Sequence, residues 1–199
     1  MKMIGLTGQS GSGKTTVSRF FLDGGFEIIN ADLVAREVME KGEVCLEETV
    51  RAFGEEILND DGTLNRKHLA EIVFSDWQKL KKLNSITHPH INKRVSEKAE
   101  ALRKCGAEYV LLDAPTLFES GEDKLCDAIV SVTAKVELRA NRIMKRDKIN
   151  NDMVMKRFSS QHSVEFFKEH SDYIIENNGS REELEEQAKD IIRQIKEKA

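Results

Sequence analysis

The residues that could do chemistry gather first in a glycine-rich loop near the N-terminus. Residues 8–15 read GQSGSGKT and fit the pattern G-x-x-x-x-G-K-[ST] at every position. Glycines let successive N–H groups turn toward a bound phosphate, and the positive end of the following helix adds to that attraction. Lys14 would reach the β- and γ-phosphates, and the Thr15 hydroxyl would bind Mg²⁺. The loop predicts a site for a phosphate-bearing nucleotide; the alternative is a flexible Gly/Ser turn.

Two aspartates stand where apolar runs end. Asp113 follows YVLL and could hold the metal ion, directly or through water, or it could simply end a strand ahead of Pro115. Asp32 follows FEIIN and would lie at the carboxyl end of a strand, where open parallel sheets bind ligands. There it could take a proton from an attacking hydroxyl. An aspartate in this place also caps helices well, so both roles stay open for Asp32.

A basic helix is expected over residues 138–148. Arg139, Arg142 and Arg146 recur at three- and four-residue spacing and therefore share one face. Guanidinium groups suit the charge that develops on a transferring phosphoryl group, whereas the alternative is a solvated basic face. The functional interpretation is favoured for Arg142 and is weaker for the other two. Residues 79–104 are also rich in lysine and arginine, which would suit a substrate with its own phosphates or would simply be solvated.

The elements that must position these residues alternate between strand and helix. Apolar runs predict buried strands over 1–7, 26–30, 109–113, 127–133 and 172–177, with helical patterns between them. Such an alternation indicates a parallel sheet covered on both faces. The stretch of about 43–104 reads as helical throughout and is expected to be an inserted lobe on the acceptor side. A capping box of Ser180 and Glu183 begins the last helix.

Composition limits the class of protein. The chain has 199 residues, 39% of them hydrophobic and 33% charged, and a net charge of −4. It suits one domain, without a global attraction for nucleic acid or anionic membrane. No apolar run approaches the ~20 residues that span a bilayer. Cys45, Cys105 and Cys126 are far apart and form no CxxC pair, which favours reduced thiols in a cytoplasmic protein.

Other classes lack their signatures. Neither NKRV (92–95) nor DAPT (113–116) fits the guanine-reading or metal-binding motif of a GTPase. The chain shows no LSGGQ signature, no HExxH spacing and no GxSxG motif, so a transporter ATPase, a zinc enzyme and a serine hydrolase are not indicated. The basic stretches lack interleaved aromatic residues, so nucleic-acid binding is not expected. A small-molecule kinase is favoured. Another nucleoside or nucleotide kinase, or a nucleotide-dependent binding protein without an acceptor, stays open as an alternative.

The chain resembles the dephospho-coenzyme A kinase family over nearly its whole length. The motifs that carry the resemblance are, in order, GLTGQSGSGKTTVSRFF, INADLVAREV, DGTLNRKHLAEIVFSD, LNSITHPHI, DAPTLFE, NRIMKRD, RFSSQ and DYIIENNGSREEL. The resemblance implies a P-loop NTPase-type α/β fold of about five parallel strands flanked by helices, with a helical acceptor lobe and a lid. The core would comprise 1–42 and 105–199, the lobe about 43–104 and the lid about 138–150.

The implied activity is transfer of phosphate from ATP, with Mg²⁺, to the ribose 3′-hydroxyl of dephospho-coenzyme A, the last step of coenzyme A synthesis. A cytoplasmic monomer that binds no nucleic acid and no membrane is expected. By the resemblance, the catalytic residues are Asp32 as base, Lys14, Arg142 and Arg146. The nucleotide-binding residues are Gly8, Gly11, Ser12, Gly13, Lys14, Thr15, Thr16, Arg142 and Gln161. The acceptor-binding residues are Asp32, Arg66, His88 and Thr116, and the metal-binding residues are Thr15 and Asp113.

The chain departs from the family pattern at a few positions. Asn30 stands where the family has an aspartate, and Thr116 stands at a usually apolar site, where it could alter acceptor affinity. Ser159 and Ser160 replace a more usual alanine pair before Gln161, which could change contact with the adenine. Within the ITHP element a helix is expected to begin at Pro89, a favourable residue for a first turn.

Overall fold

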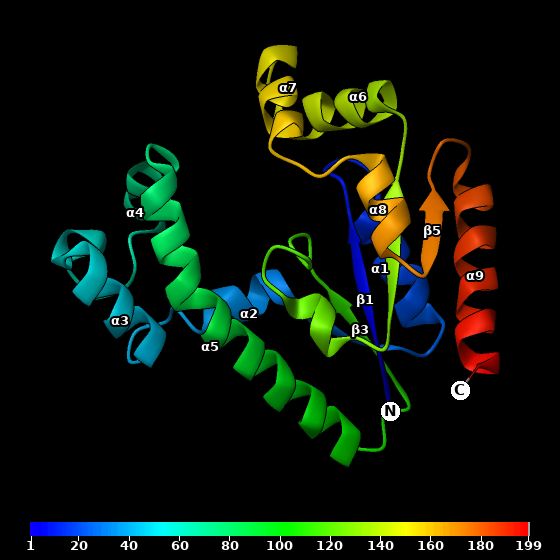
Figure 1. The fold of residues 1–199 in the computed structure, drawn as a ribbon, viewed down its shortest axis with the longest axis horizontal. Coiled ribbons are helices and arrows are strands. Elements are labelled where there is room, and N and C mark those ends of the chain that lie inside the picture. Colours follow the sequence, from blue (N-terminus) through cyan, green and yellow to red (C-terminus); the bar gives the residue numbers. More distant parts are fainter. Residues whose placement is uncertain (199) are drawn as a thin grey trace. The chain divides into compact units, whose positions relative to one another are not determined.

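The strands form one sheet in the order β2-β3-β1-β4-β5 (Figure 1). The computed structural model describes residues 1–198. The strands are β1 (Lys2–Gly8), β2 (Glu27–Asn30), β3 (Tyr109–Asp113), β4 (Ala128–Thr133) and β5 (Tyr173–Glu176). The parallel register pairs Leu6 with Asp113, Gly8 with Val132 and Thr133 with Glu176. The predicted five-stranded parallel sheet is confirmed.

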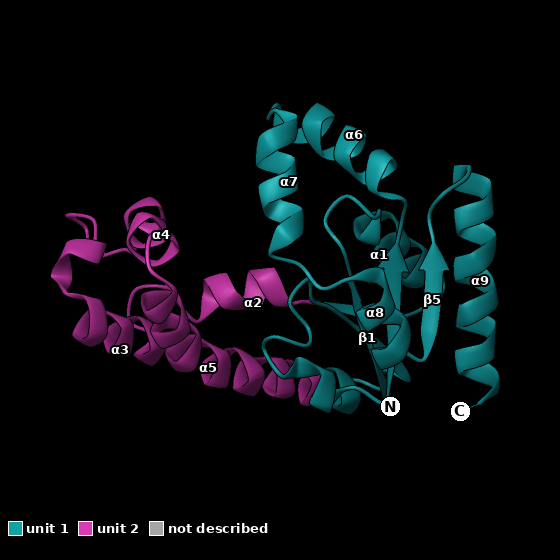
Figure 2. Ribbon diagram, turned by 45° about the horizontal axis from the view of Figure 1, so that its top comes forward, with its two compact units in different colours: residues 1–29, 102–199 teal, residues 30–101 magenta. Residues whose placement is uncertain are grey.

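The chain divides into two compact units, which Figure 2 colours separately. One unit comprises Met1–Ile29 and Leu102–Ala199, and the other comprises Asn30–Ala101. The predicted extents of the lobe (43–104) and the lid (138–150) stay predictions.

In the unit that contains most of the sheet, helices alternate with the strands along the chain. These are α1 (Lys14–Asp23), α6 (Val136–Asp147), α7 (Asn151–Ser159), α8 (Val164–His170), α9 (Arg181–Glu197) and the short 3₁₀ helix η2 (Glu122–Leu125). Ser180 caps α9: its side chain accepts from the backbone N–H of Glu183 at 3.2 Å, and the Glu183 carboxylate accepts from the backbone N–H of Ser180. The predicted capping box is therefore confirmed.

The main core of this unit follows from the alternation of side chains along each strand. Ile4 and Leu6 point to the same face of the sheet and pack with α1 and α9, as do Leu111, Val130, Val132 and Ile175 from the neighbouring strands. The glycine between them turns to the opposite face, where a Cβ on Gly5 would lie 2.8 Å from a methyl of Leu117. Packing on both faces explains why the strands read as continuous apolar runs.

The other unit is helical. It contains α2 (Ala31–Glu37), α3 (Val44–Phe53), the 3₁₀ helix η1 (Glu55–Ile57), α4 (Arg66–Phe74) and most of α5 (Trp77–Lys104). Ion pairs join the helices at their surfaces, with Arg94 Nη2 at 2.9 Å from Glu43 and Lys98 Nζ at 3.0 Å from Glu37. Leu46 and Val95 are among the buried apolar side chains of this unit.

Helical structure does not run through all of 43–104, and the prediction is wrong at residues 58–65. Leu58 and Leu64 form an antiparallel bridge there, around a turn that reads NDDGT. Asp61 accepts hydrogen bonds from the backbone N–H of Thr63 at 2.9 Å and from its hydroxyl at 2.6 Å, and Gly62 has φ +78°. Aspartate and asparagine offer the backbone such local bonds in place of a helix, so the turn residues prevail over the helical pattern on either side.

The expected helix start at Pro89 is also wrong. Pro89 lies inside α5, twelve residues after that helix begins at Trp77. A proline within a helix removes one N–H donor and crowds the carbonyl one turn earlier. The helix continues because buried residues on both sides of Pro89, including Thr87 and Val95, fix it against the rest of its unit. Along residues 1–198, none of the helices has the length and apolar character needed to cross a membrane.

Candidate active site

The P-loop lies where the sequence predicts it, between the end of β1 at Gly8 and the start of α1 at Lys14. Its conformation depends on glycine, as Gly13 and Gly8 show. Gly13 has φ +100°, and a Cβ there would lie 2.2 Å from Nδ2 of Asn177. A Cβ on Gly8 would lie 2.3 Å from the carbonyl oxygen of Val132 on β4. Side chains at these positions would push the loop away from the strands that support it.

Side chains from elsewhere in the same unit hold successive carbonyl groups of the loop. Arg139 Nε donates to the carbonyl oxygen of Ser10 at 3.0 Å, and Arg142 Nη1 donates to that of Gly11 at 3.2 Å. Asn177 Nδ2 donates to the carbonyl oxygen of Ser12 at 2.7 Å. With its carbonyl groups bound to protein donors, the loop can offer N–H groups to an anion.

The side chains of Lys14, at the start of α1, and Asp113, at the end of β3, lie together. The ammonium group of Lys14 forms an ion pair with Oδ1 of Asp113, and their side chains are 17% and 6% exposed. Thr15 is exposed in the first turn of α1, and the N–H of Thr16 donates to the carbonyl oxygen of Gly13 at 2.9 Å. The Thr15 hydroxyl and the Asp113 carboxylate are hard oxygen donors of the kind that Mg²⁺ prefers, so this chemistry fits a magnesium ion.

The three arginines of α6 have different surroundings. Arg139 is buried, and burial lowers its pKa to about 10. Arg142 is partly buried and also donates, through Nη2, to the carbonyl oxygen of Asn177 at 3.1 Å. Arg146 is exposed and its Nε lies 2.6 Å from Oδ1 of Asp147. Arg142 thus contacts the P-loop, whereas Arg146 forms a surface ion pair with Asp147, the next residue in the chain.

Gln161 joins the connection between α7 and α8 to the P-loop. Its Oε1 accepts from the backbone N–H of Ser10 at 3.2 Å, and its Nε2 lies 3.1 Å from the Ser10 hydroxyl. Beside it, Nε2 of the buried Gln9 donates to the carbonyl oxygen of His162 at 3.1 Å. The predicted nucleotide-binding glutamine is therefore close to the loop, with its side-chain amide bonded to the loop itself.

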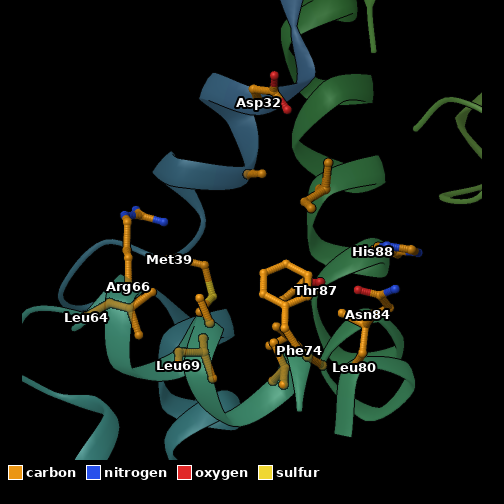
Figure 3. A pocket seen from close by; sticks show the side chains of 15 residues that line it. Asp32, Met39, Leu64, Arg66, Leu69, Phe74, Leu80, Asn84, Thr87 and His88 are labelled. Atoms are coloured by element: carbon orange, nitrogen blue, oxygen red, sulfur yellow. The ribbon is translucent and has the colours of Figure 1, made fainter. Parts of the chain in front are cut away.

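The helical unit contains a pocket of about 460 Å³ (Figure 3). Most of its lining is apolar, and Figure 3 shows the ring of Phe74 near its centre and Asp32 at one end. Arg66 and His88 also line it, so the pocket brings together these predicted acceptor-binding residues. An apolar cavity of this size with a few polar groups at its edge is typical of a small-molecule site.

Asp32 is exposed in the first turn of α2. The cap of that helix is Asn30, whose Oδ1 accepts from the backbone N–H of Leu33 at 3.0 Å. An aspartate at position 30 could cap the helix in the same way, so the cap does not explain the departure from the family pattern. Because Asn30 caps the helix, the Asp32 carboxylate is not needed for that purpose.

The other predicted acceptor residues are placed as follows. Arg66 begins α4, and its Nη2 donates to the carbonyl oxygen of Arg36 at 3.2 Å. His88 is partly buried in α5. Thr116 belongs to the other unit and is exposed after β3, where its carbonyl oxygen accepts from the N–H of Ser120 at 2.9 Å.

Sequence reasoning missed Asn177 and the particular position of Arg139. Asn177 follows β5 directly. Polar residues at the carboxyl ends of parallel strands lie where such sheets bind ligands, so Asn177 could have been singled out in the same way as Asp32 and Asp113. The spacing of Arg139 placed it on a basic face but did not reveal that its guanidinium is buried. Phe74, in the pocket, was part of a motif without a stated role.

The parallel sheet, the P-loop between β1 and α1, and the helical unit with its pocket define the class of P-loop kinases. A family model described as dephospho-CoA kinase matches residues 2–183. The chain belongs to the dephospho-CoA kinase family, and the resemblance noted from its motifs is confirmed.

Individual relatives agree with this assignment. A dephospho-CoA kinase of Listeria monocytogenes serotype 4b (strain F2365) is 40% identical over 194 residues, which cover 98% of this chain and 97% of the relative. A crystal structure of a Thermus thermophilus protein is 32% identical with a TM-score of 0.82 and covers 98% of this chain and 97% of its own. A dephospho-CoA kinase structure from Campylobacter jejuni is 28% identical with a TM-score of 0.73, covering 97% of this chain and 96% of its own.

Proposed function

We propose that this chain transfers the γ-phosphoryl group of ATP to the ribose 3′-hydroxyl of dephospho-coenzyme A, giving coenzyme A and ADP. One observation carries the proposal: a complete P-loop, with its carbonyl groups held by protein donors, occurs in a member of the dephospho-CoA kinase family. This reaction is the last step of coenzyme A synthesis.

The donor nucleotide would bind at the P-loop. The N–H groups of the loop and of the first turn of α1 would donate hydrogen bonds to the phosphate oxygens. The residues involved would be Gly8, Gly11, Ser12, Gly13, Lys14, Thr15 and Thr16. Lys14 would exchange its contact with Asp113 for the β- and γ-phosphates. Arg142 and Arg146 would offset the charge that develops during transfer. Gln161 would contribute by fixing Ser10 beside the bound nucleotide.

Thr15 and Asp113 would hold Mg²⁺, directly or through water. The ion would supply charge neutralisation at the β- and γ-phosphates. Removal of divalent cations by EDTA is expected to stop phosphoryl transfer, and added Mg²⁺ is expected to restore it. Full activity in excess EDTA would contradict this assignment.

The acceptor would bind in the pocket of the helical unit, with Asp32 as the general base. The pocket joins an apolar surface to a carboxylate at one end (Figure 3), which suits an acceptor with an apolar chain and a reacting hydroxyl. Arg66 and His88 would bind polar groups of the acceptor, and Thr116 is also proposed as an acceptor-binding residue. An exposed carboxylate that caps no helix is free to accept the proton of the 3′-hydroxyl.

Residues 138–150 are proposed as a lid that closes over the donor and limits hydrolysis of ATP by water. Hydrogen exchange in this segment is expected to slow when ATP and dephospho-coenzyme A are both present. Unchanged exchange would argue against a lid.

The test of the function is to detect coenzyme A by mass spectrometry after mixing the protein with ATP, Mg²⁺ and dephospho-coenzyme A. Asp32→Asn removes the base while keeping the size of the side chain, and it is expected to bind ATP but to form almost no product. Asp60→Asn is the matched control, because Asp60 is an exposed aspartate of the same unit that lies in the turn after η1.

The outcomes separate the acceptor from the base. Product from the parent and from Asp60→Asn, but not from Asp32→Asn, supports both parts of the proposal. Equal product from Asp32→Asn would remove its role as base and leave the acceptor standing. Absence of product from the parent, with ATP still bound, would overturn the acceptor.

A further inference from the structure

Arg139 is a buried cation beside the P-loop whose hydrogen-bond partners are neutral. Arg139 is 3% exposed, and its guanidinium donates to the carbonyl oxygen of Ser10 at 3.0 Å and to Oε1 of Gln161 at 2.9 Å. The guanidinium carbon lies 4.0 Å from the centre of the Phe158 ring. Burial of this charge lowers its pKa to about 10. Charge burial beside neutral groups is costly, so the position calls for an explanation beyond packing.

The contacts of Arg139 close a ring of hydrogen bonds around one residue of the P-loop. Ser10 is held through its N–H and its hydroxyl by Gln161, and through its carbonyl oxygen by Arg139. Arg139 and Gln161 also bond to each other. Every polar group of Ser10 is therefore fixed, and with it the peptide that leads into Gly11.

This peptide needs such support because the next residue is glycine in a positive-φ conformation. Gly11 has φ +77°, a region that glycine enters and leaves at little cost. A Cβ on Gly11 would lie 2.8 Å from the carbonyl oxygen of Arg139, so the loop and α6 are in close contact there. An unsupported glycine-rich loop would have to be ordered by the nucleotide itself, at the expense of affinity.

We propose that Arg139 is a positioning residue for the donor nucleotide: it fixes Ser10 and Gly11 so that the loop is ordered before the triphosphate binds, and its charge is offset when the anion arrives. The inference rests on the proposed binding of ATP at the P-loop. It does not depend on the identity of the acceptor, because binding of ATP alone tests it.

The experiment measures the dissociation constant for ATP with Mg²⁺ by isothermal titration calorimetry, with thermal unfolding measured in parallel. Arg139→Met keeps an unbranched side chain against Phe158 and removes both hydrogen bonds and the charge. A hydrogen bond from a charged donor accounts for about tenfold to a hundredfold in an equilibrium, so the dissociation constant is expected to rise by about that factor. Lys189→Met is the matched control, since Lys189 is an exposed cation of the same unit on α9, outside the proposed lid, and it is expected to leave the constant unchanged.

Arg139→Lys and Gln161→Met can each be measured alone if Arg139→Met does not fold, and they sharpen the test if it does. Arg139→Lys preserves the charge, but one ammonium group cannot replace a fork that reaches two acceptors, so only part of the affinity should return. Gln161→Met removes the hydrogen bonds of the Gln161 side chain to Ser10 and Arg139. Because both residues act through Ser10, the effects of Arg139→Met and Gln161→Met should fall well short of additive in the double variant.

A role confined to folding would give a different result. The positioning role raises KM for ATP and leaves KM for dephospho-coenzyme A unchanged. A lower melting temperature with an unchanged ATP dissociation constant would overturn the proposal, and so would full recovery by Arg139→Lys or strict additivity with Gln161→Met. A parent protein that bound no ATP would refute the proposed function instead.

Discussion

Substitution of Gly13 by alanine is expected to destabilise the chain through two separable contributions. Gly13 adopts φ +100°, which an alanine enters only with strain, and its Cβ would lie 2.2 Å from Nδ2 of Asn177. The amide group of Asn177 can move aside, but it then loses its 2.7 Å hydrogen bond to the carbonyl oxygen of Ser12. Gly13→Ala should therefore act partly through a residue far along the chain.

The magnitude follows from these two contributions. Strain at a positive φ costs about 1–2 kcal/mol, and a buried carbonyl oxygen that loses its donor costs about 1–3 kcal/mol. Gly13→Ala should therefore lower the free energy of unfolding by about 2–5 kcal/mol. In a chain that already carries Asn177→Ala, the obstructing amide and its hydrogen bond are both gone, and only the strain of about 1–2 kcal/mol remains.

The assay is a double-mutant cycle on unfolding in urea, followed by far-ultraviolet circular dichroism in the absence of nucleotide. The parent, Gly13→Ala, Asn177→Ala and the double variant are compared, with Asn141→Ala as a control because Asn141 is exposed on α6. The expected coupling is about 1–3 kcal/mol, with Gly13→Ala less harmful in the Asn177→Ala chain. Additivity to within about 0.5 kcal/mol would refute the reasoning, because it would mean that the two residues do not act on each other.

Other predictions concern thiols, acid stability and the long helix. Cys105 is exposed, whereas burial raises the pKa of Cys126 to about 12, so a thiol reagent at pH 8 should modify the folded protein first at Cys105, and Cys105→Ser should abolish that fast phase. Hydrogen bonds from Arg146, the larger cause, and from Arg157 hold the pKa of Asp147 far below its usual range. The Asp147 carboxylate therefore contributes stability that is present above about pH 4 and is lost as the pH falls. Asp147→Asn should lower the melting temperature at pH 7, and the difference from the parent should shrink below about pH 4; a constant difference would contradict the ion pair. Pro89→Ala should raise the free energy of unfolding by about 1–2 kcal/mol because it restores a donor inside α5, and a loss of stability would count against the continuous helix.

The sheet could be predicted because its information is local. Each strand is a short apolar run that ends at glycine or at a polar residue, and burial on both faces makes such runs easy to recognise. The helical unit was harder to predict. Pro89 can begin a helix or lie within one, and the choice depends on buried neighbours such as Val95, which a pattern of residues does not reveal.

In the candidate site, too, the local part could be predicted from the sequence and the part that depends on packing could not. Gly8 to Thr15 form a contiguous motif with a known mechanism, so the phosphate-binding loop could be read directly from the sequence. The residues that hold this loop come from α6, from the α7–α8 connection and from the end of β5, and their own segments do not show which group of the loop each of them binds. Arg139 and Arg142 look alike in sequence, yet Arg139 is buried, with its guanidinium over the ring of Phe158, and Arg142 is only partly buried.

The charge of the side chains that hold the loop suits the binding of an anion and is not needed for packing alone. In a planar trans peptide the C=O and the next N–H point in opposite directions, so the bonds at the carbonyl oxygens of Ser10 and Ser12 turn the following glycine N–H groups away from their donors. Neutral side chains could hold these oxygens, as Asn177 does at Ser12, without the cost of burying a charge. Arg139 and Arg142 instead place guanidinium groups beside the loop, where they raise its positive potential. The cost of burying such cations is recovered when a triphosphate binds, so the charges that stabilise the bound anion also order the loop that receives it.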